Sequence, residues 1–126
     1  MKINGIPTRT IHPINNGAAV EIIDQTLLPY RYETRVLSDW RDCVEAISVM
    51  RVRGAPLIGI TGAWAVALAV RENPENEALL KAAETIQNAR PTAVNLQWAV
   101  QKMLATLLPR GPSLRLEAAL RCAAEM

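Results

Sequence analysis

The residues best suited to chemistry in this 126-residue chain lie at a junction where Arg53 and Gly54 precede Ala55 and Pro56. Proline is favoured at the first helical position, because its missing N–H would have no partner there, so we expect Pro56 to open a helix. The N–H groups of the helix start, the positive end of the helix dipole and the Arg53 guanidinium can converge on one phosphate. We therefore predict an anion-binding site at this junction.

A second junction places Arg90 directly before Pro91, within residues 89–96. By itself, Arg90 is a cation at the end of a helix, where the helix dipole favours it by about 0.3 to 1 kcal/mol. The Arg53 junction alone is equally consistent with a solvated arginine at a helix start. Each pattern is short enough to arise by chance, and only their combination is specific.

Other reactive side chains give weaker signals. Cys43 and Cys122 are far apart and neither belongs to a Cys-x-x-Cys pair, so the sequence indicates neither a zinc site nor a redox dithiol. We interpret both as reduced core thiols. The only histidine, His12, lies in a polar segment, where a structural or exposed role is the usual one. We predict no catalytic residue, metal site or cofactor in this chain.

The charge balance limits the possible partners. Fourteen basic and twelve acidic side chains give a net charge of +2, too even to predict binding to nucleic acid or to a membrane surface. The most apolar run, residues 55–70, contains Gly59 and Gly62 and is too short for a membrane span, so we expect a buried helix. The N-terminus lacks the apolar core of a secretory signal, and we expect a cytoplasmic protein.

These residues must be positioned by an α+β fold. A β-branched run at 20–24 is followed at 30–36 by tyrosine, threonine and valine alternating with charged residues. These two patterns predict an antiparallel hairpin with a loop at 25–29. Helical periodicity follows, with Ser38, Asn73 and Ser113 as expected N-caps of the first, third and last helices. The expected helices cover residues 39–50, 56–71, 74–90, 92–108 (or 93–108) and 113–126.

We thus expect a short hairpin or small sheet followed by a mostly helical bundle, forming one domain over residues 1–126. The last helical period reaches Met126 without a C-cap signal such as glycine. We take the chain to be truncated, and no boundary of a second domain is visible.

Three motifs occur in order: Ile-Asp-Gln at 23–25 with Leu-Pro at 28–29, Val-Arg-Gly-Ala-Pro-Leu-Ile-Gly at 52–59, and Arg-Pro-Thr-Ala-Val-Asn-Leu at 90–96. With them, the chain resembles the N-terminal domain of the methylthioribose-1-phosphate isomerase family, which also contains the regulatory subunits of translation initiation factor 2B. The resemblance covers nearly the whole chain.

The resemblance implies a homodimeric enzyme of methionine salvage that converts 5-methylthioribose 1-phosphate into 5-methylthioribulose 1-phosphate. In the family, the substrate lies between a helical N-terminal domain and a Rossmann-like C-terminal domain. The residues that would hold the substrate phosphate are Arg53, Gly54, Ala55 and Arg90. The family's catalytic cysteine and aspartate belong to the C-terminal domain, and their motifs do not occur here. The isolated chain is therefore expected to be inactive.

Two alternatives stay open at this point. One is a non-catalytic regulatory or scaffold subunit related to initiation factor 2B, although intact Arg-Gly-Ala-Pro and Arg-Pro-Thr-Ala-Val-Asn-Leu motifs favour the enzyme. The other is a ribose 1,5-bisphosphate isomerase, since the same phosphate clamp would serve another phosphorylated ribose.

Overall fold

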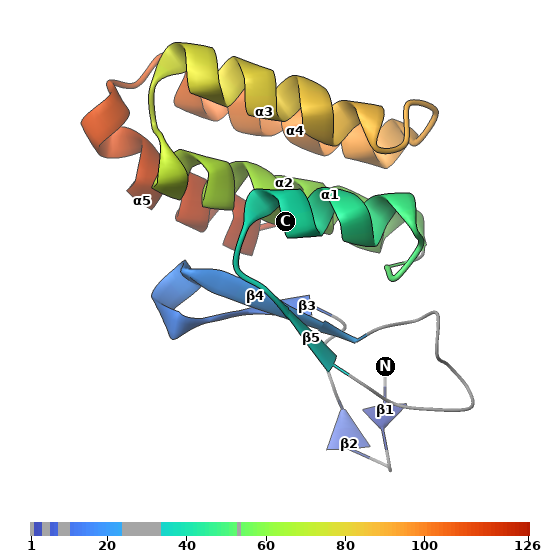
Figure 1. Cartoon of the computed structure of the whole chain (residues 1–126). Helices are drawn as coiled ribbons and strands as arrows, with labels where there is room; N and C mark the ends of the chain where they lie inside the picture. The colour runs from blue at the N-terminus through green and yellow to red at the C-terminus, as the bar shows by residue number, and fades with distance from the viewer. Residues whose placement is uncertain (1, 4–5, 8–10, 24–33, 53) are drawn as a thin grey trace.

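A computed structural model of the chain describes residues 2–3, 6–7, 11–23, 34–52 and 54–126. Its helices form a layered bundle that covers one side of a small sheet (Figure 1). The strands are β1 (Lys2–Ile3), β2 (Ile6–Pro7), β3 (Ile11–Ile14), β4 (Ala19–Ile23) and β5 (Thr34–Leu37). A 3₁₀ turn, η1 (Asn15–Gly17), is followed later by the helices α1 (Trp40–Ser48), α2 (Ala55–Glu72), α3 (Asn76–Asn88), α4 (Val94–Leu107) and α5 (Pro112–Ala124). The expected α+β class is confirmed.

The larger sheet has the order β3-β4-β5, with antiparallel pairing on both sides of β4. The pairing of β4 with β5 confirms the expected hairpin, while its loop and residues 30–33 lie outside the described residues. Strand β3 was not predicted, because Pro13 and His12 interrupt its short apolar pattern. His12 lies opposite Glu21, and its Nε2 is 3.2 Å from the Glu21 Oε1. This contact gives His12 a structural role.

The first helix is capped one residue later than predicted. Asp39, not Ser38, is the N-cap of α1, and its carboxylate accepts the Arg41 backbone N–H at 2.7 Å. A carboxylate also interacts favourably with the positive end of the helix dipole, which the Ser38 hydroxyl would not. The expectation for Ser38 was therefore wrong.

Helix α2 is the centre of the bundle and contacts α1, α3, α4 and α5 (Figure 1). The expectation that the apolar run at 55–70 is too short for a membrane span was wrong, because α2 continues to Glu72. In the described part of the chain it is the one helix long and apolar enough to cross a membrane, but 72% of it is buried within the protein. Trp64, near its middle, is 4% exposed. The prediction of a buried central helix is confirmed.

Small residues let α4 approach α2 closely. A Cβ added to Gly59 would lie 3.0 Å from the Asn95 carbonyl oxygen, and one added to Gly62 would lie 2.4 Å from the Leu96 Cδ1. The Leu96 contact is with the tip of a flexible side chain that can turn away, whereas the Asn95 contact is with backbone, which must shift by a few tenths of an ångström, so packing restricts Gly59 more than Gly62. The contact at Gly59 brings the first turns of the two helices together.

The remaining helix starts differ slightly from expectation. Helix α3 begins at Asn76 rather than near Asn73, whose side-chain oxygen accepts the Glu75 N–H at 3.0 Å in the preceding turn. Helix α5 begins at Pro112 with Gly111 as its N-cap, so Ser113 lies inside the helix. Asn73 and Ser113 therefore do not cap these helices.

Candidate functional site

The first predicted junction is the start of α2. The helix begins at Ala55, so Pro56 occupies its second position and not the first. This position suits proline equally well, because the first four N–H groups of a helix have no intrahelical acceptor. The first helical bond runs from the Ile58 N–H to the Gly54 carbonyl at 3.0 Å. Arg53, the central residue of the sequence prediction, lies outside the described residues.

Gly54 is the N-cap of α2 and has φ 91° and ψ 130°. A residue with a Cβ rarely adopts this conformation, although nothing lies within 4 Å of the place where the Cβ would be. The backbone conformation therefore requires glycine here. Because glycine has no side chain to act as a cap, the N–H groups of the first turn stay available to a ligand.

The chain reaches this junction through a tight turn after α1. The Arg51 N–H donates to the Ala46 carbonyl at 2.9 Å and the Met50 N–H donates to the Ile47 carbonyl at 3.4 Å. This is the Schellman pattern, with Met50 in the left-handed region at φ 64°. The Arg51 guanidinium bonds to Glu45 and holds the pKa of that carboxyl below its usual value.

The second predicted junction is the turn before α4. Its backbone closes through a bond from the Ala93 N–H to the Arg90 carbonyl at 3.0 Å. The Gln97 side chain also donates to the Arg90 carbonyl at 3.3 Å and to the Gln87 carbonyl at 2.9 Å. Gln97 therefore fixes the backbone of Arg90 between α3 and α4. Sequence reasoning missed Gln97, since nothing in its spacing shows that it reaches back to these carbonyls.

The two junctions meet at one pocket of about 210 Å³. Its lining residues are Ala55, Ile58, Arg90, Thr92, Ala93, Val94 and Asn95. The structure thus brings together two of the four predicted residues, Ala55 and Arg90, and Gly54 is adjacent in sequence to this lining. The half-buried Arg90 guanidinium has no hydrogen bond or ion pair within the described part of the chain.

The electrostatics of this pocket favour an anion. Helices α2 and α4 both begin at it, neither has a side-chain N-cap among the described residues, and neither has an acidic residue in its first turn. Two sets of unpaired N–H groups and two positive dipole ends therefore lie beside the Arg90 cation. In chemical terms, the arrangement can bind a phosphate or carboxylate group.

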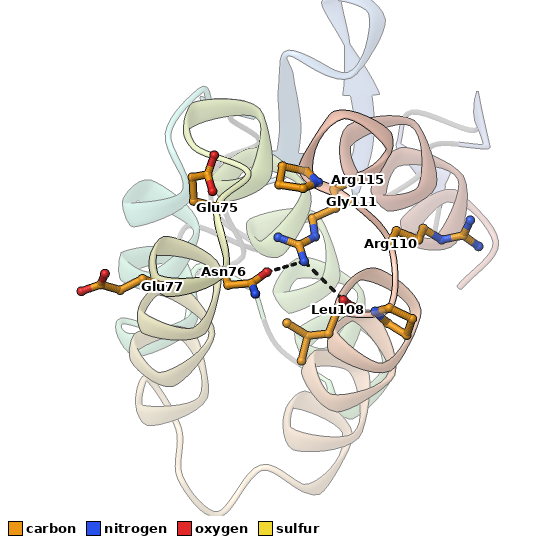
Figure 2. Close-up of a pocket in the computed structure, with 9 residues that line it drawn as sticks. Glu75, Asn76, Glu77, Leu108, Arg110, Gly111 and Arg115 are labelled. Carbon is orange, nitrogen blue, oxygen red and sulfur yellow. Dashed lines mark hydrogen bonds between the residues drawn. The ribbon is translucent and has the colours of Figure 1, made fainter.

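A second pocket, of about 620 Å³, lies at the other end of α4 and contains Arg115. In Figure 2 the Arg115 guanidinium points toward the Asn76 side chain and the Leu108 carbonyl, whereas Arg110 points outward. Arg115 is 2% exposed and also donates to the carbonyls of Leu107 at 3.0 Å and Pro74 at 2.6 Å. These bonds occupy the guanidinium, so Arg115 joins three helix ends and is not a ligand group.

Neither cysteine is placed for catalysis. Cys43 and Cys122 are buried and free, as the sequence predicted. Burial raises the pKa of the Cys43 thiol far above its usual value, and Asp42 and Asp39 add to this effect. A thiol held protonated in this way is a poor nucleophile.

Comparison with solved structures defines the class of fold. The chain matches the translation initiation factor eIF-2B delta subunit from A. fulgidus with a TM-score of 0.85 and 33% identity, covering 94% of this chain and 36% of that one. It matches 5-methylthioribose 1-phosphate isomerase from Pyrococcus horikoshii OT3 with a TM-score of 0.77 and 31% identity, over 93% of this chain and 36% of that one. The domain is of the type found in both proteins.

Sequence comparison is more specific. The chain is 49% identical to methylthioribose-1-phosphate isomerase from Rhodospirillum rubrum over 119 residues, covering 94% of this chain and 30% of that protein. The corresponding enzyme of Methylorubrum populi is 50% identical over 107 residues. The chain is thus homologous to the N-terminal region of the methylthioribose-1-phosphate isomerases, and the resemblance seen in its motifs is confirmed.

The match is partial in length. The chain spans 65% of one curated Rhodospirillum rubrum relative of uncharacterised function and about a third or less of these isomerases. No protein-family model matches the chain.

Proposed function

We propose that this chain is the phosphate-holding domain of an aldose-ketose isomerase that converts 5-methylthioribose 1-phosphate into 5-methylthioribulose 1-phosphate in methionine salvage. The observation that supports this most strongly is the pocket where the starts of α2 and α4 meet beside Arg90. The isomerases from Rhodospirillum rubrum and Pyrococcus horikoshii are similar over nearly all of this chain.

In this proposal the chain binds and orients the substrate, and a Rossmann-like C-terminal domain supplies the acid and base groups. Arg53, Gly54, Ala55 and Arg90 hold the phosphate. The helix N–H groups act as fixed donors whose orientation is set before binding, so little entropy is lost at these groups when the phosphate enters, and the Arg90 guanidinium adds a positive charge. Closure by the second domain excludes water and strengthens these contacts.

The test is an isomerase assay on the complete protein that the gene encodes. Arg90→Gln and Arg53→Gln remove charged donors to the phosphate, each with a typical contribution of about 1.5 to 3 kcal/mol. We expect KM to rise tenfold or more in both variants. Arg110→Gln, which changes an exposed arginine at the opposite end of α4, is the control and leaves KM unchanged. Normal kinetics in both site variants would contradict the proposal.

A second candidate function is that of a regulatory or scaffold subunit. The observation in its favour is the match to the A. fulgidus initiation factor subunit, which has the higher TM-score of the two structures. A complete protein that forms a stable complex with a partner and has no isomerase activity would establish this alternative.

The proposed isomerase is a cytoplasmic homodimer whose subunits each join this domain to a C-terminal domain. Analytical ultracentrifugation of the complete protein tests the dimer directly. A monomer with full activity would refute this part of the proposal.

A further inference from the structure

The Arg90 side chain has no anchor of its own beside the pocket. It is half-buried and, among the residues that the structure describes, forms neither a hydrogen bond nor an ion pair. An arginine side chain is long and rich in rotamers, so the region that its guanidinium can reach depends on where its backbone is held. For Arg90 the backbone is held by the turn that joins α3 to α4.

Two donors from the start of α4 hold the carbonyl of Arg90. The Ala93 N–H donates to it at 3.0 Å, and the Gln97 side-chain amide donates to it at 3.3 Å. The same Gln97 nitrogen donates to the Gln87 carbonyl at 2.9 Å, in the last turn of α3. Because both acceptors are carbonyl oxygens, only the NH₂ end of the amide can make these bonds. Gln97 therefore joins the end of α3, the Arg90 backbone and the start of α4.

The chain cannot make the bond to Gln87 in the ordinary helical way. The N–H that would bond to the Gln87 carbonyl if α3 continued belongs to residue 91, which is a proline and has no N–H. The Gln97 amide takes the place of this missing donor. Gln97 and Gln87 do not line the pocket, whereas Arg90 does. An effect of Gln97 on a bound anion must therefore pass through Arg90.

We infer that Gln97 is a positioning residue for anion binding, which holds the Arg90 backbone at the start of α4 so that the guanidinium and the α4 N–H groups reach one phosphate. The inference rests on the proposed function, because it takes this pocket as the phosphate site. Without the two bonds of Gln97, the folded chain keeps the same lining residues, but Arg90 must be ordered when the ligand binds, and this ordering lowers affinity.

The test is a double-mutant cycle in the isomerase assay of the complete protein. Gln97→Met keeps the length of the side chain and removes both donors. We expect KM to rise about threefold to tenfold, within the usual range of coupling between neighbouring residues, with kcat unchanged. A merely structural role would lower kcat, through a smaller folded fraction, and leave KM unchanged. Gln97→Asn, which keeps the amide on a shorter side chain, replaces Gln97→Met if that variant does not fold.

Gln101→Met is the matched control. It makes the same exchange at an exposed position one turn further along α4, and it should leave KM at the wild-type value. In an Arg90→Gln background, Gln97→Met should raise KM no further, because Gln97 acts through the Arg90 side chain.

The outcomes separate this inference from the proposed function. A wild-type KM in Gln97→Met, or the same rise of KM in both backgrounds, would overturn the inference and leave the phosphate site in place. A complete protein without isomerase activity, or one whose KM is unchanged in Arg90→Gln, would overturn the proposed function and this inference with it.

Discussion

The Cβ that Gly59 lacks would lie 3.0 Å from the carbonyl oxygen of Asn95. This close approach lies beside the starts of α2 and α4, which both line one pocket with Arg90. The proposed phosphate site therefore depends on a glycine that does not line that pocket.

Gly59→Ala should lower both stability and phosphate affinity. Alanine gains about 1 kcal/mol over glycine in a helix interior, but overpacking against a helical backbone costs typically 1 to 3 kcal/mol. We expect the free energy of unfolding, measured by urea denaturation, to fall by about 1 kcal/mol in Gly59→Ala and by more in Gly59→Val. A Gly59→Ala chain as stable as the wild type would show that α4 can move away freely.

Gly54→Ala should destabilise the chain through backbone strain alone. The variant must hold alanine at φ 91°, a cost on the order of 1 to 3 kcal/mol. Gly111→Ala is a matched control, because Gly111 is also an N-cap in open space but has φ −68°. Both variants replace glycine by alanine at an N-cap and so share the ordinary difference in N-cap preference between these residue types. The difference between their unfolding free energies therefore measures the backbone strain at residue 54. Equal losses would contradict this explanation.

Arg115→Met should destabilise the chain strongly, because Arg115 is a charged residue that is buried. It removes the donors to the carbonyls of Leu107, Leu108 and Pro74, and of these the Leu107 carbonyl keeps the Arg110 N–H at 3.0 Å while the other two lose the Arg115 donor. We expect a loss of about 3 kcal/mol in the free energy of unfolding. Arg121→Met on the same helix removes only an exposed pair with Glu117 and should cost less than about 0.5 kcal/mol.

Cys43 makes stability depend on alkaline pH. Because burial raises the pKa of its thiol, the folded chain keeps this proton while the unfolded chain releases it above about pH 8.5. The stability that the protonated Cys43 thiol contributes is fully present below that pH, and it is lost as the pH rises toward the higher pKa of the folded chain. In a Cys122→Ala background, Cys43→Ala should therefore show a shallower loss of stability between pH 8.5 and 10 by urea unfolding. Identical slopes would contradict this role.

The sequence predicted the helical order well because hydrophobic periodicity and proline positions are local signals. Helix boundaries were predicted less accurately. Asp39 and Asn73 each accept a backbone N–H two residues later, but the first bond caps α1 and the second closes a turn before α3, and the sequence does not distinguish these two cases. The burial of Arg115 was not predictable, since its acceptors come from residues 74–76 and 107–108, which are distant in sequence.

The site was predicted from residue types at two junctions, and their spatial proximity came from the family resemblance. The structure explains that proximity by Gly59 and by the two bonds of Gln97 to the carbonyls of Gln87 and Arg90. Neither feature has a sequence signature of its own. Tertiary contacts of this kind are what local patterns do not encode.

The most direct test of the phosphate site is a titration of the ¹⁵N-labelled chain with inorganic phosphate, followed by backbone amide shifts. The largest changes should occur at the first turns of α2 and α4, in Ala55, Leu57, Val94 and Asn95. They should disappear in Arg90→Gln and persist in Arg110→Gln. Changes centred on the Arg115 pocket, or an unaltered titration in Arg90→Gln, would contradict the account.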